Sequence, residues 1–73
     1  MENTREYLAR VKLIRENLET HLLYQRNLNA AYFPHNSIEA AHAEARLDGL
    51  RETITMVVRL QLDIERELAR DIT

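Results

Sequence analysis

The chain contains no cysteine, one glycine, one proline and only four aromatic side chains among its 73 residues. The absence of cysteine excludes disulfide bonds, a thiol nucleophile, an iron–sulfur cluster and any zinc site that depends on cysteine. A single glycine leaves no glycine-rich loop of the kind that cradles phosphate groups. We therefore expect one small domain over residues 1–73, without a cofactor and in the cytoplasm.

A strong excess of one charge and a long apolar run are also missing. Twelve acidic residues against ten basic ones give a formal net charge of −2. No basic excess is present to neutralise a phosphate backbone, so nucleic-acid binding is not expected. No apolar run approaches the roughly 18 residues of a membrane span, and the charged first residues are unlike a secretory signal. We expect neither membrane insertion nor secretion.

The one proline separates two helical segments. Pro34 biases Phe33 away from helical geometry, so the first helix should end just before it. Asn3 and Glu6 have the spacing of an N-cap and its capping-box acid. These signals predict a first helix over about residues 4–31.

A turn over residues 32–36 should lead directly into the second helix. Asn36 or Ser37 can serve as its N-cap, and only Gly49 interrupts the helical pattern over about residues 37–71. No alternating strand pattern is present. The predicted fold is all-α, an antiparallel hairpin of two helices.

The second helix carries a heptad pattern of apolar residues that predicts its packing face. These residues recur at alternating spacings of three and four, with one polar member, Gln61. The set is Ala43, Leu47, Leu50, Ile54, Val57, Gln61, Ile64 and Leu68.

A second stripe lies on the other side of the same helix. It consists of Ile38, His42, Ala45, Gly49, Met56 and Leu60. Its small residues would allow another helix to approach closely, so we expect an oligomer interface at Ile38, Ala45, Gly49, Met56 and Leu60. Two hairpins forming a four-helix bundle, or a larger helical oligomer, would cover both stripes.

The first helix has a predicted seam of Tyr7, Val11, Ile14, Leu18 and Leu22, which continues through Gln25 and Asn29 to Tyr32. A side stripe of Leu13, Tyr24, Leu28 and Ala31 accompanies it. Polar residues within a seam have two interpretations. Gln25, Asn29 and Gln61 either fix the register of the helices or line a pocket.

Candidate chemistry is sparse. Glu39 and His42 match the Glu-x-x-His spacing of helical di-iron proteins, but Glu16 and Glu19 project away from the predicted seam and cannot complete such a site. No serine forms a nucleophile motif with a histidine. We expect no metal site and no enzymatic activity.

The turn region is richer in binding groups, because aromatic and hydrogen-bonding side chains gather beside the N-terminus of the second helix. The candidate ligand-binding residues are Tyr24, Arg26, Tyr32, His35, Asn36, Ser37, His42 and Arg46. The sequence favours a non-enzymatic helical oligomer that acts by binding, as a protein-interaction regulator or adaptor. The alternative is a sequestering protein that holds an anionic, nucleotide-like small molecule in intersubunit pockets near the turn.

Overall fold

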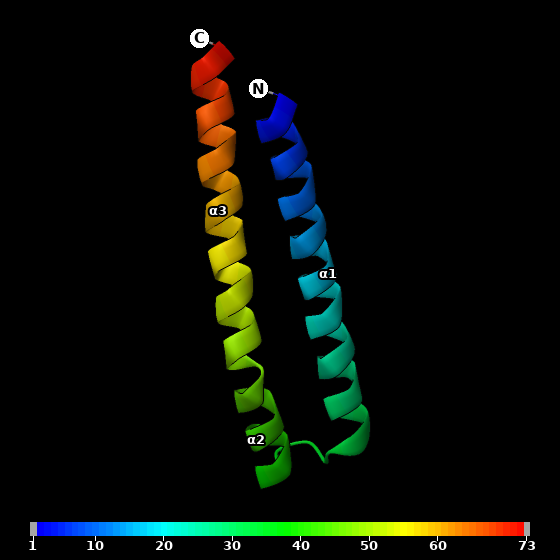
Figure 1. Cartoon of the computed structure of the whole chain (residues 1–73). Coiled ribbons are helices and arrows are strands. Elements are labelled where there is room, and N and C mark those ends of the chain that lie inside the picture. Colours follow the sequence, from blue (N-terminus) through cyan, green and yellow to red (C-terminus); the bar gives the residue numbers. More distant parts are fainter. Residues whose placement is uncertain (1, 73) are drawn as a thin grey trace.

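The computed structural model describes residues 2–72, which form two long helical arms joined by one turn (Figure 1). Helix α1 spans Glu2–Tyr32, α2 spans Ile38–Arg46 and α3 spans Asp48–Ile72. In Figure 1 the chain descends from the N-terminus through α1 and returns antiparallel to it through α2 and α3. The prediction of an all-helical chain whose two arms are joined by a bend is confirmed.

The turn has the local chemistry expected of a helix end followed by a helix start. Phe33 N–H donates to Asn29 O at 2.9 Å, which closes the last turn of α1. Asn36 adopts a left-handed backbone, with a φ of 63°, a conformation that asparagine tolerates better than most residues. Ser37 is the N-cap of α2, because its Oγ accepts the Ala40 N–H at 3.0 Å.

The second arm is broken at Leu47, two residues before the glycine at which the sequence predicted an interruption. Leu47 N–H donates to Glu44 O at 3.1 Å, so the chain makes one tighter turn there. Gly49 lies inside α3 instead. The predicted helix over residues 37–71 is therefore two helices, with the buried Leu47 between them.

The core follows the predicted seam of the second arm. Ala43, Leu47, Gln61 and Ile64 are buried, and the other four seam residues are half-buried. The opposing residue of α1 that is most fully covered is Val11. The heptad interpretation of the second arm is therefore confirmed.

The seam predicted for α1 is wrong at three positions. Tyr7 and Ile14 are 54% and 50% exposed, and Tyr32 is 76% exposed. The half-buried residues next to Tyr7 and Ile14 are instead Leu8 and Arg15. A helix with a single neighbour buries only a narrow stripe, and the stem of an arginine can cover part of it while its charged end reaches water.

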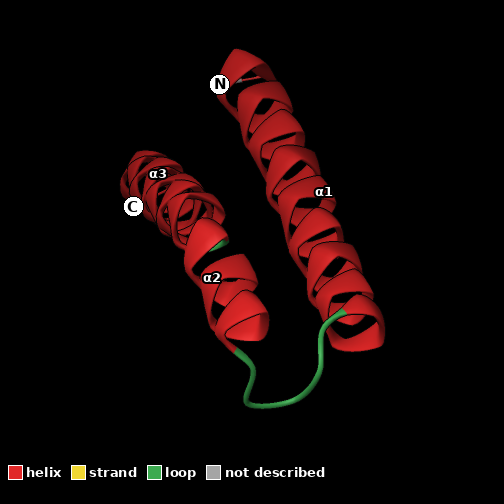
Figure 2. Ribbon diagram, turned by 90° about the horizontal axis from the view of Figure 1, so that it is seen from below, coloured by secondary structure: helices red, strands yellow, loops and turns green. Residues whose placement is uncertain are grey.

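The hairpin is a thin rod whose outer surfaces are not covered by another element of residues 2–72. Its Cα atoms extend over 53 × 14 × 13 Å. Viewed from the turn end, α1 stands alone beside the α2–α3 arm (Figure 2). None of the described helices combines the length and the apolar character that crossing a membrane requires.

Candidate functional site

An open hollow of about 680 Å³ lies at the turn end of the hairpin, between the last turns of α1 and the first turns of α2. Four of the eight predicted ligand-binding residues line it. These are Arg26, His35, Asn36 and Ser37. The structure therefore brings together half of the predicted set, three residues of the turn and the start of α2 with Arg26 of α1.

Helical spacing explains which further residues line this hollow. Asn29, Ala30 and Phe33 follow Arg26 at three- and four-residue steps on α1, whereas Ala40, Ala41 and Glu44 follow Ser37 in the same way on α2. None of these six residues is among the eight predicted ligand-binding residues. The periodicity of each helix, counted from Arg26 and from Ser37, contained the signal that would have found them.

The polar groups of the hollow are of mixed charge. Arg26 and His35 can donate hydrogen bonds, and the first turn of α2 adds the positive end of a helix dipole. Ser37 Oγ is already engaged with the Ala40 N–H. The one carboxylate that lines the hollow, Glu44, is also engaged, as described below.

Two other candidate residues occupy a separate, smaller hollow. His42 and Arg46 line it together with Phe33, Glu39 and Ala43, and its volume is about 140 Å³. Phe33 lines both hollows. The aromatic ring of the turn is therefore a shared wall that divides the predicted site into two.

The remaining two candidates, Tyr24 and Tyr32, line neither hollow. Their side chains are 58% and 76% exposed. Their placement therefore does not support their prediction as ligand-binding residues. Phe33 is the aromatic residue that stands where a flat ligand could stack.

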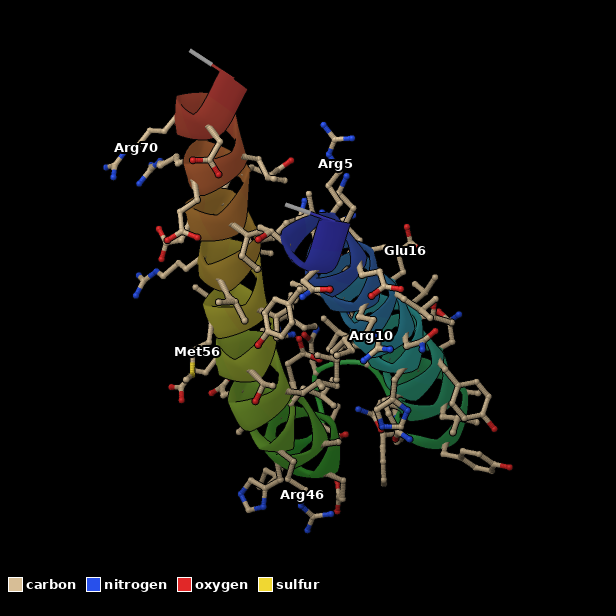
Figure 3. All side chains as sticks on the ribbon, turned by 45° about the horizontal axis from the view of Figure 1, so that its top comes forward. Arg5, Arg10, Glu16, Arg46, Met56 and Arg70 are labelled. Atoms are coloured by element: carbon tan, nitrogen blue, oxygen red, sulfur yellow. The ribbon has the colours of Figure 1, made fainter. Side chains whose placement is uncertain are left out.

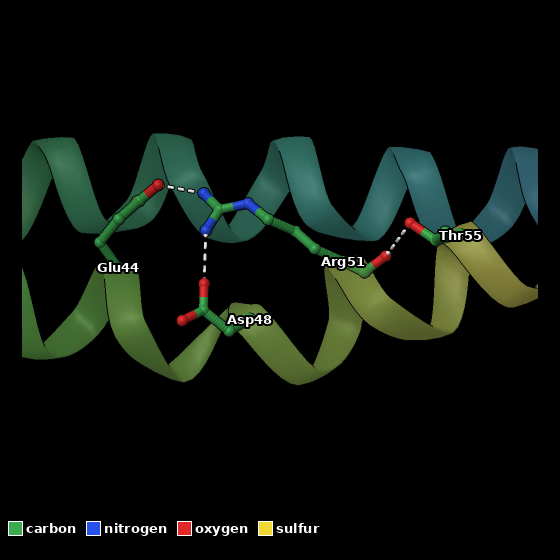
Figure 4. A network of polar contacts seen from close by, with 4 residues as sticks. All are labelled: Glu44, Asp48, Arg51 and Thr55. Carbon is green, nitrogen blue, oxygen red and sulfur yellow. Dashed lines mark hydrogen bonds and ion pairs between the residues drawn. The ribbon is translucent and has the colours of Figure 1, made fainter.

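A network of charged side chains joins α2 to α3 across the break at Leu47 (Figure 4). The Arg51 guanidinium donates to Glu44 Oε1 and, at 3.0 Å, to Asp48 Oδ1. The hydrogen bond to Glu44 is the main reason that the pKa of Arg51 is raised above its ordinary value. The positive charge of Arg51 thereby offsets the negative charge of Glu44 at the edge of the larger hollow.

The arrangement offers little for metal or nucleophilic chemistry. Glu39 and His42 both line the smaller hollow, but within residues 2–72 no group of three histidine or carboxylate side chains could hold a metal ion. Ser37 Oγ, the one serine oxygen near a histidine of the turn, serves the helix cap. The polar groups of the two hollows can form hydrogen bonds with a bound molecule.

The predicted interface stripe is exposed throughout. Ile38 and Met56 are 74% and 67% exposed, and Leu60 is also exposed. Met56 projects away from α1 (Figure 3). A Cβ built on Gly49 would meet nothing within 4 Å.

Comparison of the chain with protein-family models, with curated proteins and with solved structures found no match.

Proposed function

We propose that this chain is a non-enzymatic, cytoplasmic binding protein that acts as a regulator or adaptor through the exposed apolar surface of its helical hairpin. The observation that carries the proposal is the imbalance of its apolar residues. Four hydrophobic residues are buried, whereas ten large hydrophobic residues are exposed among those described. Exposed apolar surface on this scale is typical of a protein that works with a partner bound.

The shape of the molecule supports the same function. A rod 53 Å long presents helix faces that suit helix-in-groove and helix-bundle contacts, in which apolar anchors recur at three- and four-residue steps. Nine of its ten basic residues are arginine, which forms directional ion pairs at interfaces more readily than lysine does.

A photo-crosslinking amino acid at position 56 tests this function in the cells from which the sequence comes. Met56 is 67% exposed within the predicted interface, and Leu62, which is 46% exposed, provides the control. We expect a crosslinked protein adduct from position 56 and little or none from position 62. No protein adduct from position 56 would contradict the proposed function.

Capture of a small anion in the larger hollow is a second candidate function. It is favoured by one observation, the convergence of Arg26, His35 and the N-terminus of α2 on one hollow whose carboxylate is paired with Arg51. A phosphate could accept hydrogen bonds from Arg26 while a base stacked on Phe33.

Calorimetry with a panel of linear and cyclic nucleotides tests the second candidate. Arg26→Ala should abolish binding, whereas Arg46→Ala should change it little, because Arg46 lines the smaller hollow. If no nucleotide binds the wild-type chain with a Kd below about 100 μM, a range worth about 5 to 6 kcal/mol, this candidate is wrong.

A further inference from the structure

Several of the exposed apolar residues of the two arms occupy equivalent positions. On α1, Tyr7 and Ile14 come directly before the half-buried Leu8 and Arg15. On α3, Leu60 comes directly before the buried Gln61. A residue that precedes a packing residue by one position points about 100° away from the packing face. The direction of this rotation is the same in both arms when each helix is viewed from its own N-terminus.

The antiparallel arrangement places these two sets on the same side of the hairpin. Seen from one end of the hairpin, the residues of two antiparallel helices rotate in opposite directions. The residues that directly precede the packing residues of each arm therefore lie on the same side of the hairpin. We call this side the apolar flank. Its members are Tyr7, Ile14, His21 and Leu28 of α1, at seven-residue spacing, and Ile38, His42, Ala45, Gly49, Met56 and Leu60 of α2 and α3.

The opposite side of the hairpin has a different character. The positions of α1 that directly follow its packing residues are Arg5, Lys12, Glu19 and Arg26. Arg15 forms an ion pair with Glu19, in which its Nε lies 3.1 Å from Glu19 Oε1. The network of Arg51 with Glu44 and Asp48 lies on this side of the second arm. The ion pairs of Arg15 and Arg51 thus lie on the side of the rod away from the apolar flank.

The exposed area of the whole chain is large enough to include an interface of ordinary size. The chain exposes 6010 Å², whereas a folded monomer of 8.6 kDa typically exposes about 4,700 Å². The difference, about 1,300 Å² per chain, exceeds the roughly 800 Å² per partner of a standard interface and falls in the range of obligate dimers.

We infer that the occupant of the apolar flank is a second copy of this chain, so that two hairpins pack flank to flank into a four-helix bundle. A twofold interface sets each patch against an identical patch. An apolar patch can be buried against its own copy without leaving a charge unpaired. Packing one pair of helices on another would cover the exposed hydrophobic residues of the apolar flank, Tyr7, Ile14, Ile38, Met56 and Leu60. This inference rests on the proposed binding function and names the partner for it.

Sedimentation equilibrium of the purified chain at about 10 to 100 μM tests the inference. The wild type should have twice the mass of the chain. Ile14→Glu and Met56→Glu should each weaken self-association by at least about tenfold, because each would bury an unpaired carboxylate in the interface. Leu23→Glu and Leu62→Glu place the same charge at exposed positions outside the apolar flank, and they should leave the mass unchanged.

Several results would overturn the inference. A wild-type monomer at 100 μM would do so whatever the variants show, even if the variants fail to fold. Equal weakening by the two pairs of variants would show that the apolar flank is not the interface. If the chain is monomeric but the crosslinker at position 56 captures a different protein, the second copy is excluded while the proposed binding function stands.

Discussion

Gln61 is a polar side chain within the packing face of α3, with only 8% of its surface exposed. Its Nε2 donates a long hydrogen bond of 3.4 Å to Glu65 Oε1, and its Oε1 is buried without a hydrogen-bond partner. A buried carbonyl oxygen that lacks a partner typically costs about 1 to 3 kcal/mol. The residue therefore lowers the stability of the hairpin, as a residue that fixes register does in coiled coils.

Gln61→Leu should raise the thermal stability of the protein. Removing the unpaired oxygen should increase the free energy of unfolding by about 1 kcal/mol, which raises the Tm of a chain of this size by about 4 to 8 °C. The same change should broaden the distribution of oligomeric states, because a polar residue at a seam position restricts them. Circular dichroism melts and native mass spectrometry measure the two effects. A lower Tm would show that Gln61 is satisfied by contacts that the hairpin alone does not provide.

The sequence predicted which polar side chains are buried better on the second arm than on the first. The buried Gln61 follows directly from unbroken spacings of three and four. On α1 the half-buried arginine at position 15 conceals the packing stripe, because a charged residue is not expected in a seam. Tyr7 and Ile14 were assigned to the core for that reason, although they lie on its flank.

At the level of elements, α2 depends on features outside its own nine residues. Isolated helices shorter than about 12 residues are marginal in water. Helix α2 is held at its start by the Ser37 cap and at its end by the buried Leu47 and the Arg51 network. The sequence predicted Asn36 or Ser37 as the cap, whereas it placed the interruption at Gly49, two residues after the break at Leu47.

Ser37→Ala should destabilise the protein through α2. Loss of an N-cap oxygen costs about 1 kcal/mol, so the Tm should fall by about 4 to 8 °C. Ser37→Asp keeps an oxygen that can accept the Ala40 N–H and should retain most of the stability. Thermal melts of both variants compare them. If the two variants melt at the same temperature, the cap does not stabilise α2.

For the whole molecule, the helical hairpin could be predicted because the residues that determine it act locally in the sequence. One proline, a capping serine and heptad spacing determine two arms and their direction. The hollow at the turn was only half predicted, because its walls come from both arms and depend on how they meet. Phe33 and Asn29 line the hollow because the two arms meet there, whereas Tyr24 and Tyr32 are exposed outside it.

Gly49→Leu separates the effect of a helix substitution from the effect of assembly. In a single hairpin, a Cβ at this position meets nothing within 4 Å, and replacing a helical glycine typically gains up to about 1 kcal/mol. In the bundle, a branched side chain would be forced into the close approach of the second hairpin. We therefore expect at least a tenfold loss of self-association by sedimentation.

The matched control at this position is Gly49→Ala, whose small side chain should retain assembly and gain helix propensity. A Gly49→Leu protein with the mass of the wild type and a higher Tm would show that the second copy does not approach Gly49.

We expect the break at Leu47 to divide the hairpin into parts whose local openings cost different free energies. Amide hydrogens exchange with solvent through local openings, and a short helix joined by exposed ion pairs opens at a lower free energy than a long one packed along its whole length. Residues 38–46 should therefore exchange faster than the centre of α3 around Ile64, and salt should widen the difference by screening the Arg51 network. Because α2 forms one wall of the larger hollow, local opening of α2 would remove that wall.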